Sequence, residues 1–79
     1  MDRKRRELLL KEKMTVIGKR LRQERLSRNW DLLEVVIQSG VNQQTIYNLE
    51  NSLDCNPTIK TLINLADAFE MDLFTLLTT

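Results

Sequence analysis

The sequence predicts an all-α domain, a compact bundle of five helices preceded by a basic N-terminal extension. The chain has 79 residues, which is the length of a single domain. Its 42% hydrophobic and 29% charged residues, with two Gly and one Pro, suit a helical domain better than a disordered chain or a series of β-turns. Apolar residues recur at helical spacing, and alternating strand patterns of useful length are missing.

The first helix is predicted from an apolar stripe, but the stripe leaves its beginning open. Spacings of four, three and four residues place the stripe on one helical face. The stripe consists of Leu10, Met14, Ile17 and Leu21. The helix either runs back through the basic segment or begins afresh at Thr15, which can act as a cap. We therefore divide the chain into a basic extension at residues 1–14, either helix or arm, and a domain at residues 15–79.

The second helix is predicted from its capping signal. Asp31 and Glu34 have the spacing of a capping box, and Trp30 and Val35 flank the cap as an apolar staple. A helix therefore begins near Leu32.

The remaining helices are predicted from similar signals. Asn42 and Asp72 are cap residues with the same flanking staple, and Pro57 followed by Thr58 opens the helix between them. The core face of that helix is predicted to consist of Ile59, Leu62, Leu65, Ala66 and Phe69.

A short turn joins the second predicted helix to the third. Gly40 can adopt the left-handed conformation that ends one helix, and Asn42 can cap the next two residues later. Two short helices joined in this way cross sharply, as in a helix-turn-helix, although an ordinary corner between two helices gives the same signal. The third helix favours the first interpretation, because Ile46 and Leu49 share one face while amides and a phenol occupy the other.

The polar face of the third helix suits contact with DNA bases. A carboxamide offers a donor and an acceptor on one plane, the pattern needed to contact N6 and N7 of adenine in the major groove. A merely solvated face would be better served by Lys and Glu, which have higher helix propensity. Ordinary polar residues at a helix start remain the alternative. We expect base contacts from Gln43 and Gln44 as the principal readers, supported by Tyr47 and Asn48.

Composition excludes several functional classes. The chain has no His and a single cysteine, Cys55, so it has no internal disulfide, no Cys/His zinc site and no Ser-His or Cys-His catalytic pair. We therefore expect neither enzyme activity nor a cofactor or metal. Apolar runs are far shorter than the roughly 20 residues that span a bilayer, so we expect no membrane contact and a soluble, cytoplasmic protein.

The formal net charge of +1 conceals an uneven distribution. Residues 1–28 hold eleven Lys and Arg against four acids, whereas residues 29–79 hold one Lys against seven acids. The basic end suits nucleic acid phosphates or an acidic protein, and charge alone does not choose between them. A solvated basic tail with no partner is the third possibility.

The segment from Ile17 to Leu77 resembles the lambda-repressor-like helix-turn-helix domains of the Cro/CI and XRE type. The matching motifs are Ile17-Gly18-Lys19-Arg20-Leu21-Arg22, Gly40-Val41, Thr45-Ile46, Leu49-Glu50, Asn56-Pro57-Thr58, Thr61-Leu62 and Leu65-Ala66. The resemblance implies a five-helix DNA-binding domain that acts as a homodimer on a double-stranded operator with an inverted repeat. It also implies that Asn51 lies near the DNA backbone and that Arg25 and Glu50 form a structural ion pair.

The expected phosphate contacts depart from the family pattern. Leu32 stands where relatives often have a phosphate-binding Gln, and the loop at residues 52–56 contains Asp54 but no Lys or Arg. Phosphate contacts must therefore come mainly from the first helix and the N-terminal segment, although each candidate could equally be an ordinary surface charge. The candidates are Arg20, Arg22, Arg28 and Lys60. We expect a shallow salt dependence unless the Arg3 to Arg6 run joins in.

Two functions follow from these observations. The first is a sequence-specific transcriptional regulator, with repression favoured, whose subunits pair through the last helix, with Phe74 and Leu77 as candidates. The second is an antitoxin or another protein-interaction module. In that case the apolar surface of Leu32, Leu33 and Ile37 packs against a partner chain or against Leu8 to Leu10. The alternative is that these are scattered exposed apolar residues, which are common on protein surfaces.

Overall fold

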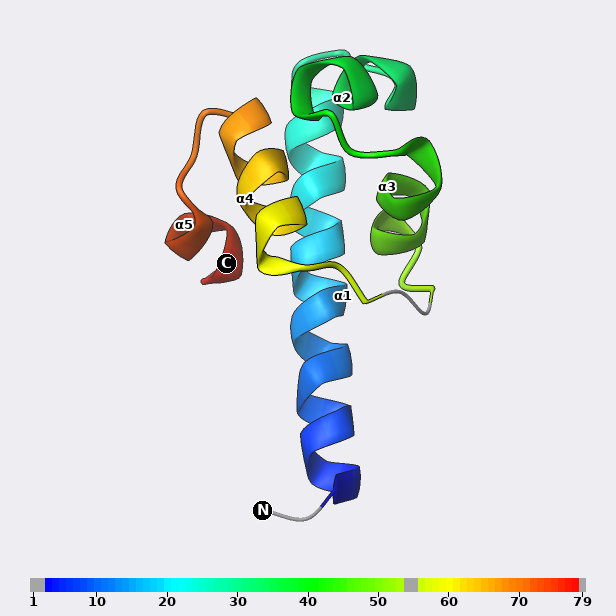
Figure 1. The fold of residues 1–79 in the computed structure, drawn as a ribbon, viewed down its shortest axis with the longest axis vertical. Helices are drawn as coiled ribbons and strands as arrows, with labels where there is room; N and C mark the ends of the chain where they lie inside the picture. The colour runs from blue at the N-terminus through cyan, green and yellow to red at the C-terminus, as the bar shows by residue number, and fades with distance from the viewer. Residues whose placement is uncertain (1–2, 54–55, 79) are drawn as a thin grey trace.

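The computed structural model describes residues 3–53 and 56–78, and every regular element in them is a helix. The five helices are α1 (Arg3–Ser27), α2 (Leu32–Ser39), α3 (Gln43–Glu50), α4 (Ile59–Ala68) and α5 (Leu73–Leu77) (Figure 1). The predicted all-α class with five helices is confirmed. None of the described helices is long and apolar enough to cross a membrane. The expectations for Asp54 and Cys55 lie outside the described residues.

The first helix is continuous from Arg3 to Ser27, so the alternative in which a new helix begins at Thr15 is wrong. The Thr15 hydroxyl instead donates a hydrogen bond of 3.0 Å to the carbonyl of Lys11, one turn earlier. A helix of 25 residues is about 37 Å long at 1.5 Å per residue, close to the longest molecular dimension of 40 Å. Its N-terminal turns therefore project past the other four helices (Figure 1).

The four shorter helices begin at the predicted caps. In each case the cap side chain accepts a hydrogen bond from the backbone amide three residues later, which satisfies an otherwise unpaired N–H. The caps are Asp31, Asn42, Thr58 and Asp72, with bond lengths of 2.9, 2.9, 3.1 and 2.7 Å. Only half of the predicted capping box forms. The Glu34 backbone amide donates to Asp31, but the Glu34 side chain accepts a hydrogen bond from Gln38 at 2.9 Å and not from the Asp31 amide.

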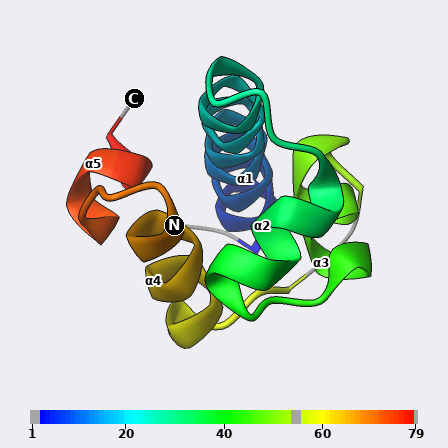
Figure 2. The same cartoon turned by 90° about the horizontal axis from the view of Figure 1, so that it is seen from above.

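The turn between α2 and α3 has the predicted geometry. Gly40 lies in the left-handed region at φ 74°, and its amide donates to the Val36 carbonyl at 2.8 Å to close α2. Asn42 then caps α3 with its backbone extended. The two helices consequently cross sharply, as in a helix-turn-helix (Figure 2).

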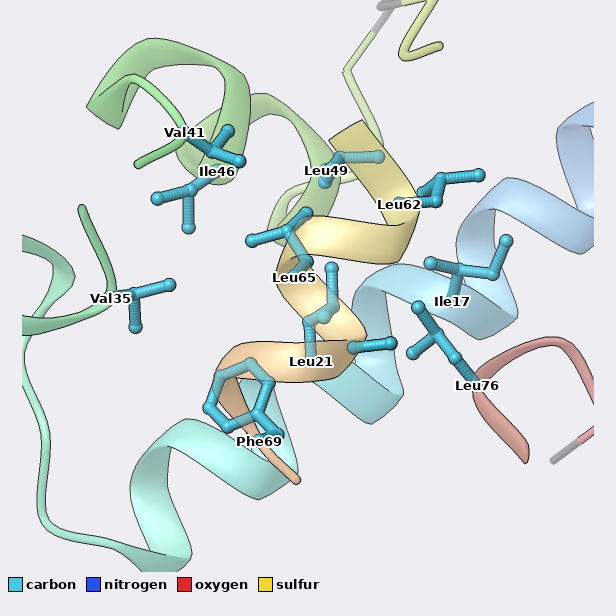
Figure 3. Packing of buried hydrophobic residues seen from close by; sticks show 11 residues of the cluster. Ile17, Leu21, Val35, Val41, Ile46, Leu49, Leu62, Leu65, Phe69 and Leu76 are labelled. Atoms are coloured by element: carbon cyan, nitrogen blue, oxygen red, sulfur yellow. The ribbon is translucent and has the colours of Figure 1, made fainter. Parts of the chain in front are cut away.

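One apolar core joins all five helices. Figure 3 shows its side chains meeting between α1, α3 and α4, with Val35 and Leu76 entering from either side. The buried members are Ile17, Leu21, Val35, Val41, Ile46, Leu49, Leu62, Leu65, Ala66, Phe69 and Leu76. Leu10 and Ile59 were expected on core faces, but they are 61% and 62% exposed. Both residues line a surface groove instead, because Ile59 is the first residue of α4 and Leu10 lies in the N-terminal half of α1, which projects past the other helices.

The crossing of α1 and α3 depends on a single glycine. Gly18 is buried, and a Cβ added there would collide with the backbone carbonyl of Leu49. Only hydrogen fits at this position, so α1 and α3 pack with their backbones in contact. The orientation of α3 is thereby fixed against the longest helix of the fold.

The apolar surface of α2 does not meet the N-terminal extension. Leu33 and Ile37 are 58% and 66% exposed. Figure 1 places α2 beside the C-terminal end of α1, whereas Leu8 to Leu10 lie near the opposite end. The proposed packing between these two segments is therefore wrong. Leu32, in contrast, is half-buried and packs against the core.

Candidate nucleic-acid interface

The outer face of α3 presents polar side chains from a rigid support. Ile46 and Leu49 are each 1% exposed and hold the inner face of the helix in the core. On the opposite side Gln43 and Gln44 are exposed, and Tyr47 is 46% exposed. These three residues line a shallow depression on the surface. Three of the four side chains expected to contact bases therefore lie together and open to solvent, whereas the fourth, Asn48, is half-buried and lines a separate groove.

One hydrogen bond orders the amides of this face. The Gln44 Nε2 atom donates to Asn48 Oδ1 at 2.9 Å, across one helical turn. A carboxamide has two N–H donors and an acceptor oxygen, so Gln44 keeps one donor and its oxygen for a base edge. The bond restricts the rotation of the Gln44 side chain, which reduces the entropy that binding would cost.

Asn51 has a structural role at the C-terminal end of α3. Its Nδ2 atom donates to the Tyr47 carbonyl at 2.9 Å, and its backbone amide donates to the same oxygen at 3.1 Å. Its side chain is exposed. A phosphate contact, as the resemblance implies, would use the second N–H of the carboxamide.

Arg25 and Glu50 tie the end of α3 to α1 and to the loop before α2. Arg25 donates through Nε and Nη2 to the two carboxylate oxygens of Glu50, both at 2.8 Å, and through Nη1 to the Trp30 carbonyl at 3.0 Å. The two charged side chains are 14% and 4% exposed. The hydrogen bonds to Glu50 raise the pKa of Arg25. This pair positions α3 and is not accessible to DNA.

A second cluster of charges lies at the C-terminal end of α1. Glu24 accepts from Arg28 at 2.6 Å and from Arg20 at 3.1 Å. These bonds, mainly the one from Arg28, lower the pKa of Glu24. Arg28 also donates to the Phe69 carbonyl at 2.8 Å and lies over the rings of Trp30 and Phe69.

This cluster was not predicted, although the spacing of four residues between its three charged members, Arg20, Glu24 and Arg28, is a signal for such pairs. Arg20 and Arg28 were candidates for phosphate contact, and in the structure both are engaged with Glu24. The other two candidates, Arg22 and Lys60, are exposed on α1 and α4. These two are better placed to meet a phosphate.

The two dimer candidates on α5 differ in their exposure to solvent. Phe74 is 75% exposed, whereas Leu77 is half-buried and packs against the core. The aromatic ring of Phe74 is thus the larger apolar surface on α5. Among residues 3–53 and 56–78 no group of acidic or sulfur side chains is arranged to hold a metal ion.

Most of the sequence matches the model of a known protein family. Residues 21–76 match the family model HTH_3, which describes a helix-turn-helix. The match begins in the C-terminal half of α1 and continues into α5. No curated protein sequence matches the chain. The N-terminal turns of α1 lie outside the matched segment.

Proposed function

Because the chain belongs to the helix-turn-helix family HTH_3, a family of DNA-binding regulatory domains, we propose that it is a sequence-specific transcriptional regulator that reads the major groove with α3. The observation that carries this proposal is the outer face of α3, where Gln43 and Gln44 are exposed on a helix whose inner face is buried. The N-terminal residues of such a helix enter the groove most deeply.

The fold supports rigid presentation of these amides. The Gly18 contact and the Arg25–Glu50 pair hold α3 at its C-terminal half, and the Asn42 cap orders its first turn. A well-formed bidentate contact with a base discriminates by about 1–3 kcal/mol. That discrimination requires a side chain whose position is set before binding.

The proposal includes a homodimer on an inverted repeat. Phe74 is the apolar residue on α5 with the largest exposed fraction, so it is the position we propose for the pairing of subunits. Arg22 and Lys60 supply phosphate contacts, which orient the domain without reading sequence. Repression is the mode we favour, because a small domain that occupies a promoter is sufficient to exclude another protein.

Selection of bound DNA from a random duplex pool tests the proposal. We expect an inverted repeat with half-site centres about one helical turn apart. Gln44→Ala should cost about 1–3 kcal/mol at one base position, while Arg22→Ala weakens all sequences similarly. Gln23→Ala is the matched control, since it removes an exposed amide from α1. Recovery of no preferred sequence at low salt would contradict the proposal.

The exposed apolar surface of α2 favours a second function, the binding of a protein partner by an antitoxin-like module. Leu33 and Ile37 are both more than half exposed on one short helix. Substitution of both by Gln should abolish binding of such a partner and leave DNA affinity unchanged. Equal loss of both activities would count against a separate protein site on α2.

A further inference from the structure

The N-terminal half of α1 is a strongly basic helix that projects from the domain. We call residues 3–14 of α1 the α1 extension. Its side chains are exposed, apart from Met14 at its end, which is half-buried. The positive residues are Arg3, Lys4, Arg5, Arg6, Lys11 and Lys13, and the negative residues are Glu7 and Glu12. Figure 1 shows the extension continuing along the axis of α1 beyond α3 and α4.

Two pairs of cations occupy opposite sides of the α1 extension. Lys4 and Lys11 are seven residues apart, which is nearly two full turns, so they share one side. Arg6 and Lys13 have the same spacing, and they are displaced by two residues, or about 200° around the axis. The two pairs therefore offer equal charge on opposite faces.

The Lys4 and Lys11 face is the one turned toward α3. Gly18, seven residues after Lys11, packs against the Leu49 carbonyl of α3. Lys11 lines a groove of about 530 Å³ together with Glu7, whose carboxylate pairs with Arg3, and the opposite wall of the groove contains Asn48 and Ser52. The face is thus continuous with the C-terminal end of the helix that we propose to read DNA.

The pattern of the extension favours a polyanion over a lipid surface or a partner helix. Leu8, Leu9 and Leu10 are consecutive, so they point in three directions, and only Leu10 continues the apolar stripe that leads to the core. Among the described residues no carboxylate forms an ion pair with Lys4 or Lys11. Two lysines on one exposed helical face match a row of phosphates, which carry one charge per about 1.7 Å of duplex.

We propose that Lys4 and Lys11 bind phosphates of the DNA that flanks the half-site read by α3, so that the α1 extension lengthens the DNA contact. The inference rests on the proposed function, because it takes α3 as the helix in the groove. Lys4 and Lys11 are separated by about 10 Å along the helix, a distance that spans several phosphate charges. The extension adds affinity at positions where no base is read.

The test compares two double variants of the full chain, Lys4→Gln/Lys11→Gln and Arg6→Gln/Lys13→Gln. Each removes two positive charges, and Gln retains high helix propensity. Binding is measured against salt concentration on a long duplex that contains the selected site. Loss of two phosphate contacts should make the slope of log K against log salt shallower by about 1.8 for the Lys4/Lys11 variant. The Arg6/Lys13 variant should retain nearly the wild-type slope.

Duplex length supplies a second readout. Trimming the duplex to the recognised site should remove the difference between wild type and the Lys4/Lys11 variant, because the flanking phosphates are gone. Equal effects of the two double variants, or an effect that persists on the trimmed duplex, would overturn the proposal. So would a wild-type slope for the Lys4/Lys11 variant.

The two proposals fail in different ways. Gln44→Ala should change the sequence preference and leave the salt slope unchanged, whereas Lys4→Gln/Lys11→Gln should do the reverse. If selection yields no preferred sequence, the salt slopes measured on a random duplex still show whether the Lys4 and Lys11 face binds phosphate. Circular dichroism of each variant checks that α1 remains helical.

Discussion

The two halves of α1 are parts of one continuous helix, yet their side chains lie in opposite surroundings. In the C-terminal half Ile17, Gly18 and Leu21 are buried against the other helices. In the N-terminal half Leu8 and Leu10 are 62% and 61% exposed. The same secondary structure thus serves as the central support of the core at one end and as a solvated projection at the other.

The charges of α1 differ less sharply between the two halves, because Arg3 in the N-terminal half pairs with Glu7 at 3.4 Å on an exposed surface. Arg20 and Arg25 in the C-terminal half, and Arg28 just after it, all bond to carboxylates. Lys4 and Lys11 in the N-terminal half have no such bond among the described residues. A count of Lys and Arg therefore overstates the charge available to DNA, because the fold uses part of it internally.

The largest effect is expected where the C-terminal half of α1 holds α3. Glu50→Ala leaves the Arg25 guanidinium largely buried without its partner, which should lower the free energy of unfolding by about 3–5 kcal/mol. Urea denaturation measures the change. Glu12→Ala is the control, since it removes an exposed acid from the α1 extension and should cost under about 0.5 kcal/mol. Similar losses for both would mean that burial of the pair has little energetic consequence.

A smaller loss is expected at the backbone contact between α1 and α3. Gly18→Ala adds a methyl that collides with the Leu49 carbonyl, so we expect a loss of about 3 kcal/mol, at the upper end for overpacking. Helix propensity alone would predict a gain of about 1 kcal/mol for the same substitution. The sign of the change therefore separates packing from propensity.

Gly40→Ala provides the comparison for Gly18. A Cβ at Gly40 meets no atom within 4 Å, but the residue lies at a positive φ of 74°. Only the conformational cost of about 1 kcal/mol is expected there. Urea denaturation of both variants measures the change in the free energy of unfolding. A loss for Gly18→Ala no larger than that for Gly40→Ala would show that α1 and α3 can move apart at little energetic cost.

The fold could be predicted largely because its signals are local. The caps at Asp31, Asn42, Thr58 and Asp72 act on amides three residues away, so the sequence contains both partners of each bond. The left-handed turn at Gly40 is local in the same sense. The outward face of α3 followed from helical periodicity, since Ile46 and Leu49 mark the buried side.

Contacts between distant residues could not be predicted in this way. The bond from Arg28 to the Phe69 carbonyl joins positions 41 apart in sequence, and the approach of Gly18 to Leu49 is set by how two helices cross. Periodicity identifies a face but not whether another element covers it. For that reason the apolar stripe predicts Leu10 in the core although it is exposed, and the sequence does not decide between a helix and an arm for residues 1–14.

The smallest effect is expected in the α1 extension, where the comparison between the two halves is most direct. Leu8→Gln and Leu10→Gln replace exposed side chains, so each should change the free energy of unfolding by less than about 0.5 kcal/mol. Urea denaturation at two protein concentrations measures this. A loss above about 1 kcal/mol that grows with concentration would mean that these leucines pack against a second copy of the chain. In that case the extension would be part of an interface, and Lys4 and Lys11 would be less accessible to DNA than the single chain indicates.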